Sequence, residues 1–324
     1  MPPGFGAGSP KEAHRPMDVL YIASQMVMLS LPIALGYAAH KAGIMIDEVD
    51  HNLSRIVLEV ALPCLIVASI GTVDALPGAG TIAVVLAASA FANALALAVG
   101  FAATAAMRAP ADAAGAYRYM IAFGNCSFMG FPVVSAVLGG KAVLLLAIVS
   151  IPANLLMFSV GVSLFSARGG WRRYLRSCAG SLKSPTLVAS LLTLALVLAG
   201  VNDLGIVGGA LDIVGQLTTP AALLIIGSSL ARYDLGAMFG NPRAYIAAAC
   251  RLLVVPLLAA AALGAAGVDA TVAAVVVIGV GMPVATNGTL YCLQYGVDMK
   301  PMIQATFLSV VGSIATIPLL VAVL

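Results

Sequence analysis

Long apolar runs separated by short polar connections make up most of this 324-residue chain. Each run approaches or exceeds the length of about 20 residues that spans a hydrocarbon core of about 30 Å. The pattern therefore predicts an all-α polytopic membrane protein with ten transmembrane helices. The runs cover residues 17–39, 52–71, 80–106, 117–138, 142–166, 184–200, 206–230, 242–264, 270–295 and 301–323.

Two of these runs carry helix-breaking and polar residues near their centres. The fourth contains GNCSFMGFP from Gly124 to Pro132, and the ninth contains GMPVATNGT from Gly281 to Thr289. Proline lacks an N–H group and clashes with the preceding turn, so we expect both helices to break. Broken backbone persists in a membrane only where protein or a wet cavity satisfies its polar groups. The residues assigned to the breaks and their crossing are Gly124, Gly130, Pro132, Gly281, Pro283 and Gly288.

The two halves of the chain contain similar short segments in the same order. SLP at Ser30 resembles KSP at Lys183, LPCLIVASI resembles TPAALLIIGSS, and the fourth run resembles the ninth. Five spans per half insert the second half upside down, which is the inverted-repeat plan of secondary transporters. We expect a disordered tail (1–16), a first repeat (17–166), a cytoplasmic loop (167–183) and a second repeat (184–324).

Charge is scarce, and its placement sets the orientation. The chain is 61% hydrophobic and 9% charged, with a net charge of +3, which excludes a soluble domain and gives no reason to expect nucleic acid. Lys11, Arg15 and Lys141 fall on the side of the tail, and the other thirteen Lys and Arg residues fall on the opposite side. Positive residues favour the cytoplasm. We therefore expect an inner (plasma) membrane protein with both termini outside.

The two breaks are the candidate binding site. Each break frees backbone N–H groups at the start of a half-helix, where the partial positive charge of the helix dipole binds anions. Polar side chains would add neutral contacts, although asparagine also satisfies freed backbone groups in a purely structural role. The candidate substrate-binding residues are Asn125, Ser127, Thr286, Asn287 and Thr289 in the breaks, with Asn154 and Gln304 facing the same region.

Two ionisable residues enter the apolar runs. Glu59 either pairs with Arg55 one turn earlier or acts as a proton-coupling carboxylate. Arg251 either extends to the cytoplasmic face or helps to attract an anion. Both are candidate coupling residues, and the ion pair and the extended arginine are the structural alternatives.

Other kinds of chemistry lack a motif. Neither break contains an acidic residue, so a carboxylate-built Na⁺ site is not expected there, although carbonyl and amide oxygens remain available. No nucleophile–base pair, phosphate-binding loop or metal cluster is present in the sequence, and the five cysteines show no CxxC spacing. We expect no enzyme activity, no cofactor and no metal.

Three stretches resemble the auxin efflux carrier family, whose bacterial members are similar to the plant PIN exporters. They are GNCSFMGFPVVSAVLG, GMPVATNGTLYCLQYG and LTTPAALLIIGSSLA, and the similarity covers nearly the whole chain from about Met17. The resemblance implies a bile-acid-symporter-like fold with a scaffold of helices 1, 2, 6 and 7 and a transport domain of helices 3–5 and 8–10. It also implies substrate binding where helices 4 and 9 cross, and a homodimer formed through the scaffold. The family pattern matches Asn125 after Gly124, Pro132, Pro283 and, more loosely, Asn154.

The chain departs from the plant pattern at two places. Gly124 stands where plant carriers have a crossing proline, and the connection between the fifth and sixth runs is short. The expected function is efflux or exchange of a small organic anion, such as a carboxylate or an auxin-like acid, by elevator-type movement of one domain against the other. The alternatives are a sodium-coupled symporter of the bile-acid type and an anion channel or sensor. The expected partners are this substrate, the lipid bilayer and a second copy of the chain.

Overall fold

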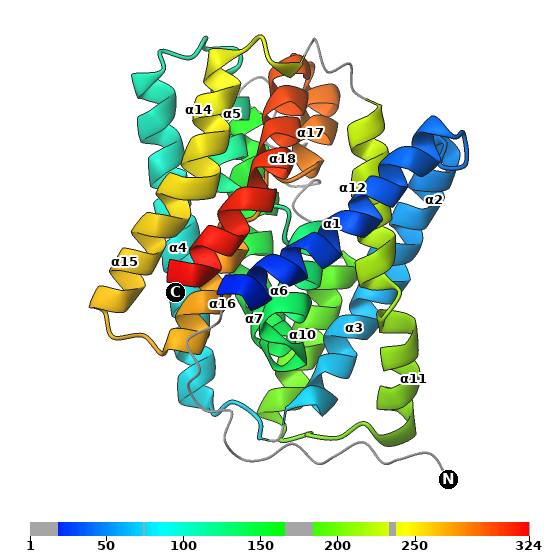
Figure 1. The fold of residues 1–324 in the computed structure, drawn as a ribbon. Coiled ribbons are helices and arrows are strands. Elements are labelled where there is room, and N and C mark those ends of the chain that lie inside the picture. Colours follow the sequence, from blue (N-terminus) through cyan, green and yellow to red (C-terminus); the bar gives the residue numbers. More distant parts are fainter. Residues whose placement is uncertain (1–18, 74, 166–183, 233–237, 324) are drawn as a thin grey trace.

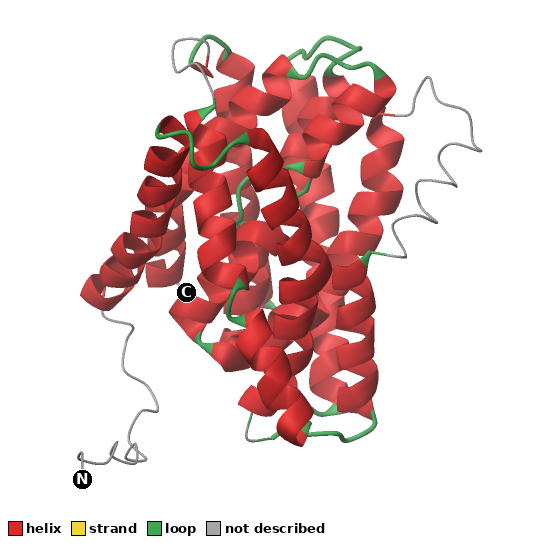
Figure 2. Ribbon diagram, turned by 90° about the vertical axis from the view of Figure 1, so that its right-hand side faces the viewer, coloured by secondary structure: helices red, strands yellow, loops and turns green. Residues whose placement is uncertain are grey.

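The computed structural model describes residues 19–73, 75–165, 184–232 and 238–323. The expected tail at 1–16 and the basic connection at 167–183 lie outside these residues. Within them the chain is helical and no β-strand occurs, as Figure 2 shows. Among the described residues, six helical stretches are long and apolar enough to cross a membrane, and shorter apolar helices accompany them. The all-α fold class is therefore confirmed at this level.

The first half follows the order of the predicted runs. Its helices are α1 (Val19–Lys41), α2 (Asp47–Ile56), α3 (Leu62–Ala68), α4 (Ala79–Ala106), α5 (Ala114–Ala122), α6 (Phe131–Leu138), α7 (Gly140–Leu156) and α8 (Val162–Phe165). Single π-helical turns at Val57–Ala61 and Met157–Gly161 join α2 to α3 and α7 to α8. A 3₁₀ turn at Ser69–Thr72 extends α3, and a π-helical turn at Cys126–Gly130 leads into α6.

The second half is likewise built of helices. Its helices are α10 (Pro185–Leu198), α11 (Gly205–Gly215), α12 (Thr218–Ala231), α14 (Pro242–Ala249), α15 (Val255–Ala265), α16 (Ala270–Val280), α17 (Asn287–Tyr295) and α18 (Lys300–Val323). A π-helical turn at Cys250–Val254 joins α14 to α15. Figure 1 shows α5 and α17 in the upper half of the molecule and α6 and α16 in the lower half.

Capping residues mark where several helices begin and end. The Oδ1 atom of Asp269 accepts hydrogen bonds from the backbone N–H groups of Thr271 (3.0 Å) and Val272 (3.1 Å) at the start of α16. Asn241 caps α14 in the same way. Gly296 ends α17 in the left-handed conformation with φ of 68°, which glycine adopts without a steric penalty. These local signals fix the helix boundaries that apolar composition leaves open.

Packing separates the helices into two groups. In one, α1 lies along α12, and α3 packs against α10 and α11. In the other, α4 packs on α5 and α7, α14 on α18, and α15 on α16. The groups meet where α10 contacts α7, where α1 contacts α18, and where α12 contacts the π-helical turn at Cys126–Gly130. The candidate site lies between them.

Two glycines allow α1 and α12 to touch backbone to backbone. A Cβ atom on Gly227 would lie 1.9 Å from the carbonyl oxygen of Ile33, and one on Gly36 would lie 2.1 Å from that of Leu224. Both distances are far below van der Waals contact. Side chains at either position would push the two helices apart.

Gly227→Ala is therefore expected to destabilise the protein, by at least the about 1–3 kcal/mol typical of overpacking. The measurement is the thermal unfolding midpoint of purified protein in detergent. Gly209→Ala is the matched control, because a Cβ atom on this glycine of α11 meets no atom within 4 Å. The control should melt at or slightly above the wild-type temperature, since alanine favours helix by up to about 1 kcal/mol. Equal midpoints for the two variants would contradict the close approach of α1 and α12.

Candidate functional site

Both predicted interruptions are present in the structure. Helix α5 ends at Ala122, the chain is non-helical from Phe123 to Asn125, and a helix resumes at Cys126. Helix α16 ends at Val280, and the backbone stays non-helical until α17 begins at Asn287. The two interruptions thus lie inside apolar helices, where water does not satisfy free backbone groups.

The two interruptions satisfy one another by crossing. Gly124 and Val284 form an isolated antiparallel β-bridge. The N–H group of Asn125 donates to the carbonyl oxygen of Pro283 (2.7 Å), and that of Ala285 donates to the carbonyl oxygen of Phe123 (3.0 Å). The two breaks are therefore held in contact through backbone hydrogen bonds.

Three residues assigned to the breaks lie elsewhere. Gly130 and Pro132 sit in continuous helix, after the interruption and around the junction of the π-helical turn with α6. The wider π-helical turn accommodates a proline because it alters the backbone pairing that the missing N–H group would disrupt. Gly288 lies in the first turn of α17, where a Cβ atom would collide with Met302 and Tyr119. Gly124, Gly281 and Pro283 do lie in the non-helical stretches.

Free N–H groups gather at the starts of the two half-helices. The Oδ1 atom of Asn125 accepts a hydrogen bond from the N–H group of Phe128 (3.1 Å), which caps the first helix. Within the described residues, the N–H groups of Ser127, Thr286 and Asn287 have no hydrogen-bond partner. They are the orphan donors of two helix starts, where the helix dipole adds partial positive charge.

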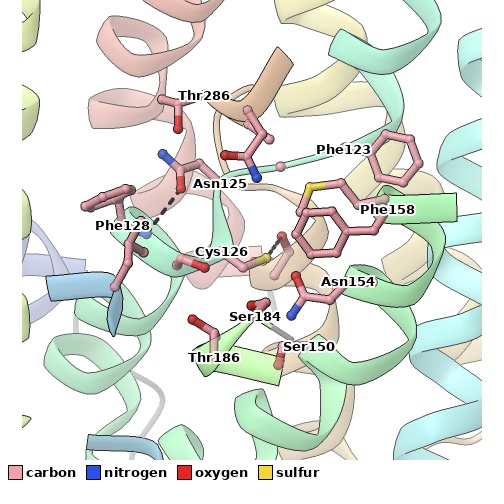
Figure 3. Close-up of a pocket in the computed structure, with 18 of the residues that line it drawn as sticks. Phe123, Asn125, Cys126, Phe128, Ser150, Asn154, Phe158, Ser184, Thr186 and Thr286 are labelled. Atoms are coloured by element: carbon pink, nitrogen blue, oxygen red, sulfur yellow. Dashed lines mark hydrogen bonds between the residues drawn. The ribbon is translucent and has the colours of Figure 1, made fainter. Parts of the chain in front are cut away.

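A cavity of about 260 Å³ lies beside this crossing. Figure 3 shows Asn125 and Thr286 on one side of it and Ser150, Ser184 and Thr186 on another. Aromatic and apolar side chains make up much of the remaining wall, namely Phe123, Phe128, Met157 and Phe158. Largely apolar walls with a few convergent polar groups are typical of small-molecule sites.

Most of the predicted site residues meet at this cavity. Its lining includes Glu59, Asn125, Ser127, Asn154, Thr286 and Asn287. Thr289 is not among the lining residues. Its hydroxyl group donates to the carbonyl oxygen of Thr286 (2.8 Å) at the start of α17. Gln304 is buried in α18, away from the cavity lining.

Sequence reasoning missed the wall that α10 provides. This helix begins at the cavity, with Ser184 as its N-cap and the 94% buried Thr186 in its first turn. The Lys-Ser-Pro sequence at 183–185 is a helix-start signal that pointed to this position. Asn93 of α4 also lines the cavity, and its amide donates to the carbonyl oxygen of Ser89 (2.8 Å).

The two ionisable candidates differ in their surroundings. Glu59 forms the expected ion pair with Arg55 (Nε–Oε1 3.3 Å), and both side chains are more than half exposed, while Glu59 also lines the cavity. Arg251 does not extend to the protein surface as one prediction had it. Its side chain is 1% exposed and donates to backbone carbonyl oxygens at the crossing, because the breaks leave those acceptors free.

Comparison with known proteins gives two findings. A family model described as membrane transport protein matches residues 21–321. A protein of Methanothermobacter thermautotrophicus described as an uncharacterized transporter is 24% identical over 305 residues, which cover 93% of this chain and 98% of that protein.

Proposed function

The chain belongs to the membrane transport protein family, the family of the auxin efflux carriers, and from this premise we propose that it carries a small organic anion. The observation that carries the proposal is the crossing of two interrupted helices beside a cavity. Ser127, Thr286 and Asn287, whose backbone N–H groups have no partner among the described residues, line that cavity. Donors fixed at helix starts bind a carboxylate without side-chain reorganisation.

The proposed architecture is a five-plus-five inverted repeat of transmembrane helices with both termini outside. In this scheme the scaffold comprises α1–α3 and α10–α12, and the transport domain comprises α4–α8 and α14–α18. The transport domain supplies the crossing and most of the cavity wall, and the scaffold supplies Glu59, Ser184 and Thr186. Sliding of the transport domain against the scaffold would expose the cavity to each side in turn. Two scaffolds would pair in a homodimer.

A size argument supports a small substrate. A cavity of about 260 Å³ is at or below the lower end of the usual range for small-molecule sites, about 300–1,000 Å³. The amides of Asn125, Asn154 and Asn287 would orient the anionic group, and the phenyl rings would cover the apolar part. Glu59 would be the proton-coupling carboxylate if transport follows a proton gradient, because it lines the cavity.

Asn125→Ala combined with Asn287→Ala is expected to lower carboxylate flux at least tenfold. The measurement is counterflow of radiolabelled malonate and indole-3-acetate in proteoliposomes. Asn202→Ala, an exposed position in the connection between α10 and α11, is the matched control and should keep wild-type flux. Unchanged flux in the folded double variant would remove both amides from the site. Flux without stimulation by unlabelled substrate on the opposite side would indicate a channel.

A further inference from the structure

Arg251 is the largest fully buried side chain among the described residues, at 1% exposure. It lies in the π-helical turn between α14 and α15 and points at the crossing of the two interrupted helices. No ion pair joins it to an acidic residue in the described part of the chain. A buried positive charge without a carboxylate is costly, so its position calls for a compensating interaction.

Backbone carbonyl groups hold the guanidinium in place. Its Nε atom donates to the carbonyl oxygen of Met282 (2.8 Å), and Nη1 donates to those of Ile121 (3.2 Å) and Ala122 (2.9 Å). Ile121 and Ala122 are the last residues of α5, where the dipole of a helix is negative. The carbonyl dipoles orient the cation and partly offset its desolvation, but they carry no formal charge to neutralise it.

One edge of the guanidinium remains available at the cavity. The Nη2 atom has no hydrogen-bond partner among the described residues. It lies against Gly124, where an added Cβ atom would be only 1.9 Å away. Both Gly124 and Arg251 line the cavity. The cavity is therefore lined by a fixed, unneutralised cation with two unused N–H groups and by the residues whose backbone N–H groups are free at the helix starts.

We propose that Arg251 is the specificity-determining residue for the charge of the substrate, with Nη2 donating to the anionic group. The inference rests on the proposed transport function. A carboxylate in the cavity supplies the counter-charge that the protein lacks at this point, and Nη2 forms a charge-assisted hydrogen bond with it. A neutral amide of the same shape leaves the arginine uncompensated. The carrier therefore selects acids over their amides through this single residue.

The test compares flux of malonate and of indole-3-acetate with flux of their neutral amides in proteoliposomes. In wild type we expect each acid to be favoured at least tenfold, and in Arg251→Gln we expect the acid-to-amide ratio to fall to near one. Arg251→Lys keeps a charge and should keep a preference for the acid. Arg243→Gln removes a positive charge from the same helix pair and is the control, because Arg243 does not line the cavity and donates to the carbonyl oxygen of Met107.

An unchanged acid-to-amide ratio in folded Arg251→Gln would overturn the inference, because loss of a structural contact alone lowers both fluxes alike. Absence of flux for every acid in wild type would instead reject the proposed function. If Arg251→Gln does not fold, a measurement of direct contact between substrate and arginine in the wild type tests the inference instead. Solid-state dipolar recoupling between the ¹³C-labelled carboxylate of malonate and ¹⁵N-labelled arginine should show a direct contact that Arg251→Lys lacks. Saturating malonate without such a contact would overturn the inference.

Discussion

Gly124→Ala is expected to abolish nearly all transport and to destabilise the fold. The new Cβ atom would lie 1.9 Å from Nη2 and 2.8 Å from Cζ of Arg251, so the guanidinium would have to leave its place. Its departure would leave the carbonyl oxygens of Ile121, Ala122 and Met282 without this hydrogen-bond donor. Each buried acceptor without a partner lowers the free energy of unfolding by about 1–3 kcal/mol. The measurements are counterflow in proteoliposomes and the thermal unfolding midpoint.

Gly130→Ala is the matched control for this prediction. It lies in the same interrupted helix and was assigned to the same break from the sequence, but a Cβ atom there would be 3.3 Å from the nearest side-chain atom, the Cβ of Cys126. A shift of a few tenths of an ångström relieves such a contact. We expect near-wild-type flux for Gly130→Ala. Similar losses in both variants would show that the region is generally intolerant and that the arginine contact is not the cause.

The contact with Arg251 also explains how this chain departs from the plant carriers it resembles. A proline at position 124 would place its Cβ atom, and the ring beyond it, in the space that the guanidinium occupies. Glycine at position 124 therefore leaves free the space that the guanidinium group of Arg251 occupies. The break does not need a proline, because the β-bridge to Val284 and the arginine together satisfy its backbone.

The sequence predicted the helical class and the interrupted stretches because both depend on composition within one segment. Apolar runs are long enough to recognise, and glycine, proline and polar residues clustered within one run indicate an interruption. Asn125, Asn287 and Asn154, which line the cavity, were chosen as candidates for the same reason, since polar residues stand out in apolar runs. The exact position of an interruption does not follow from composition: the first one spans residues 123–125, several residues before Pro132.

The surroundings of a side chain could not be predicted where they are formed by segments distant in the sequence. The surroundings of Arg251 come from α5 and from the residues after α16, about 130 and 31 positions away in the chain. Nothing in the local sequence distinguishes this arginine from one that extends to the membrane surface. The start of α10 is similar: its Ser-Pro signal predicts where the helix begins, but only the packing against α7 brings Thr186 to the cavity.

The contact between α7 and α10 provides the sharpest test of the proposed sliding movement. The hydroxyl groups of Ser150 in α7 and Ser190 in α10 lie 3.2 Å apart, and the proposal assigns α7 to the transport domain and α10 to the scaffold. Both side chains are at most 2% exposed. Hydroxyl oxygens at this distance place the two side chains next to each other, and a disulfide between cysteines requires a Cβ–Cβ distance of about 3.5–4.5 Å. A covalent bond there would fix the two groups of helices in the present arrangement.

Ser150→Cys combined with Ser190→Cys is therefore expected to lose all flux on oxidation and to regain it on reduction with dithiothreitol. Binding of malonate should survive oxidation, because neither half-helix start at the crossing is altered. Each single cysteine variant, treated with the same oxidant, controls for pairing with native cysteines and should remain active. Undiminished flux in a double variant shown by mass spectrometry to be cross-linked would mean that α7 and α10 do not separate. The alternating movement would then have to occur within one group of helices, around the crossing itself.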